Sequence, residues 1–132
     1  MDLFSTEEKI TRALLVSVDT GDFDAESSLS ELFELAQSSG AEAVASISQK
    51  LAHPDTSTCV GSGKIEEIKE YCQANDIDLI IFDTELSPTQ IRNIERETDV
   101  RVIDRTMLIL DIFAIRARSR EGKLQVELAQ LK

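Results

Sequence analysis

A glycine-rich segment with the sequence GSGK, Gly61 to Lys64, stands directly before a helical pattern. Free backbone N–H groups and the positive end of a helix can together hold a phosphate group. The segment is not a nucleotide-hydrolysing phosphate loop, because Ile65 follows Lys64 and the glycines are too closely spaced. Gly61, Gly63 and Lys64 are candidates for binding a nucleotide phosphate, and a plain loop-to-helix turn is the alternative.

Two carboxylates, Asp19 and Asp83, each follow a short apolar run. Open α/β sheets bind ligands at the carboxyl ends of their strands, so this pair could bind a cation or orient a nucleotide. Acidic residues are also common in turns and helix caps, and that alternative stays open. We predict no catalytic residue and no metal site, because His53, Cys59 and Cys72 lack both metal-ligand spacing and a nucleophile pattern.

A basic cluster occupies the segment RARSREGK near the end of the chain. Guanidinium groups at this density suit the phosphates of folded RNA, and a solvated helix face is the alternative. The formal net charge is -11, but residues 1–90 contribute -13 and residues 91–132 contribute +2. We therefore expect any anionic partner to contact the C-terminal third, through the candidate RNA-binding residues Arg116, Arg118, Arg120 and Lys123.

Hydrophobic patterning predicts the elements that would position these residues. Apolar runs at 12–19 and 78–83 read as central strands, and weaker patterns at 41–51 and 100–104 read as edge strands. Helical patterns lie between them and after the last strand, at 25–40, 64–76, 87–99 and 105–119.

The alternation of strands with helices predicts the α/β class with crossover connections and a parallel sheet. Right-handed crossovers favour four strands in the order 2-1-3-4 with helices on both faces. Gly40 should end the first helix, and Ser87 with Pro88 should begin the third. These cues predict one compact sheet whose central strands are the first and the third.

The composition is that of one globular domain, with 132 residues of which 42% are hydrophobic and 30% charged. No apolar run approaches the ~20 residues that cross a bilayer. The first ten residues, MDLFSTEEKI, lack the basic start and apolar stretch of a secretory signal. We expect no membrane span and a cytoplasmic location.

Three strings carry a resemblance to a known family: VGSGKIEEIKEY, LSPTQIRNIE and RVIDRTMLILDIFAIRARSREGKLQVELAQL. They resemble the N-terminal region of the HflX family of translational GTPases, from about Arg12 to the last residue. The resemblance implies an α/β N-terminal domain over 1–106 and a helical segment over 107–132 that begins a long hairpin before a GTPase domain. Ser62 departs from the family pattern, where Lys is frequent, and Cys59 replaces a frequent aromatic residue.

The resemblance also implies a function. Family members bind the large ribosomal subunit and its rRNA and help to split or rescue ribosomes, often under stress. GTP and Mg would belong to the GTPase domain, which would be a further partner of this chain. The chain has neither a phosphate loop nor an N-K-x-D guanine motif, so we expect no cofactor and no GTP hydrolysis in these residues. The alternative is a nucleotide-binding regulatory domain that controls the attached GTPase, because adenine-nucleotide activity is linked to this region in some members.

The last residues form an apolar stripe in which Leu124, Leu128 and Leu131 fall at i, i+4 and i+7. No Gly, Asn or Pro follows to cap the predicted helix. We expect the chain to be part of a longer GTPase in which this stripe meets the second hairpin helix. In the isolated chain, the stripe is expected to cause self-association by packing on the same stripe of another copy, and the alternative is that the tail frays beyond about Gly122.

Overall fold

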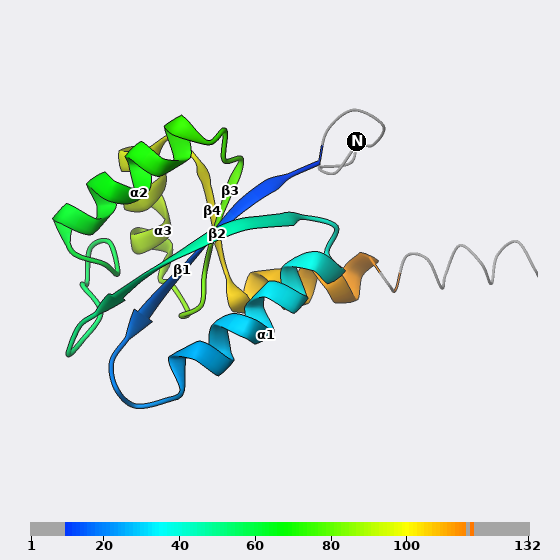
Figure 1. Ribbon diagram of the computed structural model, residues 1–132, viewed down its shortest axis with the longest axis horizontal. Coiled ribbons are helices and arrows are strands. Elements are labelled where there is room, and N and C mark those ends of the chain that lie inside the picture. The colour runs from blue at the N-terminus through cyan, green and yellow to red at the C-terminus, as the bar shows by residue number, and fades with distance from the viewer. Residues whose placement is uncertain (1–9, 116, 118–132) are drawn as a thin grey trace, which may run out of the picture.

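The computed structural model describes residues 10–115 and 117. A parallel sheet of four strands, in the order β2-β1-β3-β4, forms its centre (Figure 1). The predicted α/β class and the predicted order 2-1-3-4 are confirmed. The elements in chain order are β1 (Arg12–Asp19), α1 (Ala25–Ser38), β2 (Glu42–Lys50), α2 (Ser62–Ala74), β3 (Leu79–Phe82), α3 (Pro88–Thr98), β4 (Arg101–Asp104) and a helix over residues 105–115.

Helices cover both faces of the sheet, as predicted. Figure 1 shows α1 and the 105–115 helix on one face, with α2 and α3 on the other. Successive residues of β1 point to opposite faces. Ala13 and Leu15 are buried in the core that includes α1, whereas Leu14 and Val16 are buried in the core that includes α2. The sheet therefore separates two hydrophobic cores.

The burial of the strands follows their places in the sheet. Six consecutive residues of β1 and all four of β3 are buried, which confirms the central positions predicted from their unbroken apolar runs. The edge strand β2 is only partly buried. The other edge strand, β4, is more buried than its alternating sequence suggests, because Val102, Ile103 and Asp104 are all covered and only Arg101 is exposed.

The start of α3 and the end of α1 confirm the predicted signals. The Ser87 hydroxyl accepts a hydrogen bond from the Gln90 N–H at 3.1 Å, and the Gln90 side chain accepts one from the Ser87 N–H at 2.9 Å. This reciprocal capping box is followed by Pro88 in the first turn. Gly40 adopts a φ of 93°, a left-handed conformation that suits glycine at the end of a helix.

The start of α2 differs from the expected one. The helix begins at Ser62 rather than Lys64, so the GSGK segment forms its first turn. Gly61 is the N-cap, and its N–H donates a hydrogen bond to Gln49 Oε1 of β2 at 2.9 Å. The expected boundary was wrong because this contact across the fold fixes the entry to the helix, and no local capping side chain marks it.

The 105–115 helix packs back onto the sheet. Leu108 and Ile112 are buried in the same core as α1. On its other side, Leu110 and Phe113 are each 61% exposed. The division into 1–106 and 107–132 remains a prediction, and the leucine stripe at 124–131 lies outside the described residues. No helix in the described part of the chain is both long and apolar enough to cross a membrane.

Candidate functional site

The candidate site lies at the edge of the sheet where all four parallel strands end. After β1, the chain passes through α1 to β2 on one side of β1 in the sheet. After β3, it passes through α3 to β4, which lies on the opposite side of the sheet. Ligands of open α/β sheets bind at such a reversal, here between β1 and β3. The candidate Asp19 is the last residue of β1 and Asp83 directly follows β3, whereas Gly61 to Lys64 form the start of α2 after the connection from β2. The topology thus brings the three predicted elements to one edge.

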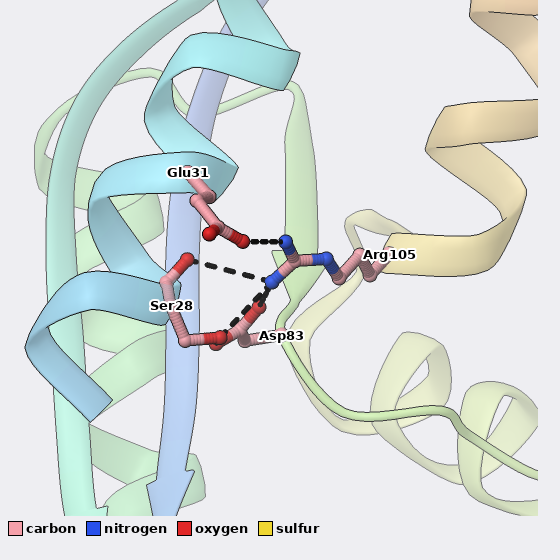
Figure 2. A network of polar contacts seen from close by, with 4 residues as sticks. All are labelled: Ser28, Glu31, Asp83 and Arg105. Atoms are coloured by element: carbon pink, nitrogen blue, oxygen red, sulfur yellow. Dashed lines mark hydrogen bonds and ion pairs between the residues drawn. The ribbon is translucent and has the colours of Figure 1, made fainter. Parts of the chain in front are cut away.

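Asp83 is held by a polar network that joins three parts of the fold (Figure 2). Nη1 of Arg105, at the start of the 105–115 helix, donates to Asp83 Oδ1 at 2.8 Å and to the Ser28 hydroxyl at 2.9 Å. The Ser28 hydroxyl donates to Asp83 Oδ2, and Arg105 Nη2 donates to Glu31. Both carboxylate oxygens of Asp83 are therefore occupied by groups of the chain itself.

The electrostatics of this network stabilise the charged form of Arg105. The Asp83 side chain is 1% exposed, whereas that of Arg105 is 25% exposed and that of Glu31 is 63% exposed. Burial lowers the pKa of Arg105, but the hydrogen bonds and negative charges of Glu31 and Asp83 outweigh burial and raise it above its ordinary value. The guanidinium of Arg105 supplies the positive charge that the buried carboxylate of Asp83 needs. A bound cation is therefore not required to balance this carboxylate.

The interpretation of the sequence missed Ser28, Glu31 and Arg105. A signal for Arg105 existed, because the predicted order 2-1-3-4 places the third and fourth strands side by side, and in the structure Phe82 and Asp104 at their ends are register partners. The residues that follow them, Asp83 and Arg105, are therefore also neighbours. No comparable signal pointed to α1, because its rotation about its own axis depends on packing.

Asp19 has separate contacts. Its Oδ1 accepts a hydrogen bond from the Gly21 N–H at 2.9 Å, and Gly21 has a φ of 87°. This is the turn that the alternative interpretation described. Asp19 also lines an open hollow of about 390 Å³ together with Lys50, the last residue of β2, and Ala52 of the connection that follows. The side-chain hydrogen bonds of Asp19 and of Asp83 thus involve different residues.

The GSGK turn retains one feature of an anion site. No side chain caps the N-terminus of α2, so its first-turn N–H groups have no side-chain acceptor. Lys64 lies in that turn, and its Nζ pairs with Glu67 at 3.0 Å near the surface. Gly61 lies close to its neighbours, because an added Cβ would lie 3.4 Å from the Gln49 side chain, whereas Gly63 has open space.

The cysteines do not add chemistry to the site. Cys59 and Cys72 are free and buried. Burial raises the pKa of each thiol to about 11, and the nearby charge of Asp55 adds to the effect at Cys59. Within residues 10–115, no cluster of three or more His, Cys, Asp or Glu side chains could hold a metal ion. Both cysteines therefore act as packing residues.

The predicted RNA-binding residues cannot be placed with the others. Arg116, Arg118, Arg120 and Lys123 lie outside the described residues, directly after the 105–115 helix in the sequence. They remain a prediction from the sequence.

The family of the chain follows from comparison with known proteins. Residues 26–114 match the family described as GTP-binding GTPase N-terminal. The chain is 51% identical over 132 residues to GTPase HflX of Lacrimispora saccharolytica, covering 99% of this chain and 31% of that protein. It is 47% identical over 131 residues to GTPase HflX of Escherichia coli, covering 98% of this chain and 30% of that protein. The chain thus spans under one third of the length of these relatives.

Solved structures agree with this assignment. The crystal structure of SsGBP with GDP matches with a TM-score of 0.63 and 27% identity, over 92% of this chain and 34% of that one. A GTP-binding protein of Sulfolobus solfataricus, also with GDP, matches with a TM-score of 0.62 and 26% identity, over 92% and 36%. Since the family match covers most of the chain and the relatives match almost all of it, the chain belongs to the GTP-binding GTPase N-terminal family, as an HflX-type N-terminal domain.

Proposed function

We propose that this domain is the ribosome- and RNA-binding module of an HflX-type GTPase. In this role it binds the large ribosomal subunit and its rRNA and helps the attached GTPase to split or rescue ribosomes in the cytoplasm under stress. The proposal is supported by membership of the family and, above all, by the distribution of charge. Residues 1–90 carry -13, whereas residues 91–132 carry +2.

This charge distribution would orient the module relative to the ribosomal RNA. The acidic body repels rRNA, and the basic cluster at 116–123 attracts it. Phosphate contacts by Arg and Lys release counterions, so binding should weaken as salt rises. The module therefore presents the basic cluster at 116–123 to the ribosome and keeps the sheet and its covering helices away from the RNA.

GTP and Mg act in the attached GTPase domain under this proposal. That domain is the second partner of this chain, and the chain itself turns over no nucleotide. The sequence has no phosphate loop and no guanine motif, which supports this division of roles.

The test is binding of the purified domain to large ribosomal subunits at several salt concentrations. We expect replacement of Arg116, Arg118, Arg120 and Lys123 by Ala to weaken binding and to flatten its salt dependence by about one unit of slope for each phosphate that is no longer neutralised. A control with the same change of charge replaces four exposed cations of the body, Lys50, Arg92, Arg96 and Arg101. Equal effects of the two quadruple variants, or no effect of the first, would refute the proposal.

The uncapped N-terminus of α2 favours a second candidate function, a nucleotide-binding regulatory domain. The candidates for it are Gly61, Gly63, Lys64, Asp19 and Asp83. Calorimetric titration with ATP tests it, with Lys64→Ala as the variant and Lys69→Ala, five residues further along α2, as the control. Binding that Lys64→Ala weakens and Lys69→Ala leaves intact would support this function, and absence of heat would exclude it.

A further inference from the structure

The chain passes from β4 into the 105–115 helix at two adjacent residues that are fixed on opposite faces of the sheet. On the α3 face, Asp104 Oδ2 accepts a hydrogen bond from the Leu86 N–H at 2.9 Å, and its Oδ1 accepts one from the Met107 N–H at 2.9 Å. On the α1 face, Arg105 reaches Ser28, Glu31 and Asp83 (Figure 2). The junction is therefore held from both sides.

The Arg105 contacts connect three separate elements. Asp83 directly follows β3, Ser28 and Glu31 lie one helical turn apart on α1, and Arg105 begins the 105–115 helix. A guanidinium is planar, with donors in a fixed fork, so two acceptors on different elements restrict its orientation. A lysine could supply the charge but not this geometry.

Without these polar contacts, apolar packing would hold the 105–115 helix along one narrow face only. Leu108 and Ile112 are its buried apolar residues, one turn apart on a single face, and Met107 is only partly buried against the same core. Such a pair fixes the distance of the helix from the sheet but resists rolling and swinging weakly, because the attraction between apolar groups has no direction. Beyond them, Leu110 and Phe113 are well exposed and contribute little restraint.

We propose that Arg105 is the positioning residue of a rigid joint that sets the direction in which the 105–115 helix leaves the sheet. The Asp83–Arg105 ion pair, with Ser28 and Glu31, locks the first turn of this helix to α1 and β3. Loss of the pair frees the helix to swing about Asp104. This proposal does not rest on ribosome binding.

The test measures a distance across the joint. Spin labels are attached to Gln37→Cys on α1 and to Ala114→Cys on the 105–115 helix, which are both exposed positions. Pulsed electron paramagnetic resonance gives the distribution of distances between the two labels. A second pair, Gln37→Cys with Glu97→Cys on α3, reports on the body alone. The native thiols are buried, so the introduced cysteines react first.

Arg105→Gln is expected to shift or broaden the distribution of the first pair and to leave the second unchanged. Arg105→Lys should restore it only in part, and Arg101→Gln, at an exposed arginine of β4, should have no effect. An unchanged first pair in folded Arg105→Gln protein would overturn the proposal. Equal broadening of both pairs would also overturn it, because it would show general loosening. If Arg105→Gln does not fold, Asp83→Asn removes the charge with less disruption, and the same two outcomes decide.

Discussion

Nη1 of Arg105 lies 2.8 Å from Oδ1 of Asp83, whose side chain is 1% exposed. Removal of the guanidinium leaves a buried carboxylate without its counter-charge, which is strongly destabilising. We expect Arg105→Ala to lower the free energy of unfolding by about 3 kcal/mol, measured by urea denaturation. The control Arg101→Ala should change it by less than about 0.5 kcal/mol, since Arg101 is exposed. A decrease at Arg105 no larger than at Arg101 would show that the ion pair contributes no net stability.

The capping box of α3 gives a second stability prediction. Ser87→Ala removes the acceptor of the Gln90 N–H, so the free energy of unfolding should fall by about 1 kcal/mol in the same assay. Thr89→Ala is the matched control, because Thr89 is exposed in the same turn and is not the capping residue. If both variants were destabilised equally, the hydrogen bond at Ser87 would not be the cause.

The buried thiols predict slow labelling. With a pKa of about 11, only about one thiol in a thousand is ionised at pH 8, compared with about one in ten for an ordinary pKa of 9.0. We expect Cys59 and Cys72 to react with a disulfide reagent only in denaturant, followed by the absorbance of the released thiolate. Rapid reaction of both thiols in the native state would contradict their burial.

The same shift predicts how stability depends on pH. Below about pH 9 the thiols are protonated in both states, and their contribution to stability is complete. As the pH rises from about 9 to about 11, the unfolded thiols ionise before the folded ones, so the free energy of unfolding falls. Denaturation curves across this range should show a shallower fall for Cys72→Ala, which retains one of the two thiols. An identical slope in that variant would assign the fall to other groups.

We predict no GTP turnover by this chain, because it has neither a phosphate loop nor an N-K-x-D motif. Phosphate release by the purified domain should equal that of a protein-free blank with Mg and GTP present. Release above the blank that follows the protein through a second purification would show the prediction wrong.

The apolar stripe at the end of the sequence predicts self-association. Burial of a Leu contributes roughly 1.5–3 kcal/mol, so Leu124, Leu128 and Leu131 together favour pairing with a second copy. Sedimentation velocity should show concentration-dependent dimers that are absent when all three are replaced by Ser. Replacement of three polar residues of the same segment, Gln125, Glu127 and Gln130, serves as the control. A monomer at all concentrations would exclude the pairing.

The sequence predicted the sheet well because its signals are local. Continuous apolar runs identified β1 and β3 as central, and the Ser87 and Gly40 signals located helix ends correctly. The start of α2 was missed because a glycine N-cap held by Gln49 of β2 leaves no local signal. Boundaries that depend on contacts across the fold cannot be found from propensity alone.

The position of Asp83 in the fold was predicted, but its hydrogen-bond partners were not. Asp83 was identified from its position after an apolar run, and it does lie at the reversal of strand order. Its bonds to Arg105 and Ser28 were not predicted, because they span 22 and 55 residues of sequence. The predicted strand order placed the third and fourth strands side by side, but it did not specify their register. Local patterns also do not specify the rotation of α1 that brings Ser28 to Asp83.

The place of β1 between β2 and β3 has a consequence for folding. β1 is the first strand of the described sheet in the chain, yet one of its two neighbours comes much later, and the Arg12 N–H donates to Asp78 across 66 residues. During synthesis a strand with six consecutive buried positions must therefore wait with one edge unpaired. Such long-range parallel pairing slows folding. The nascent domain is therefore most vulnerable to aggregation before β3 has emerged and paired with β1.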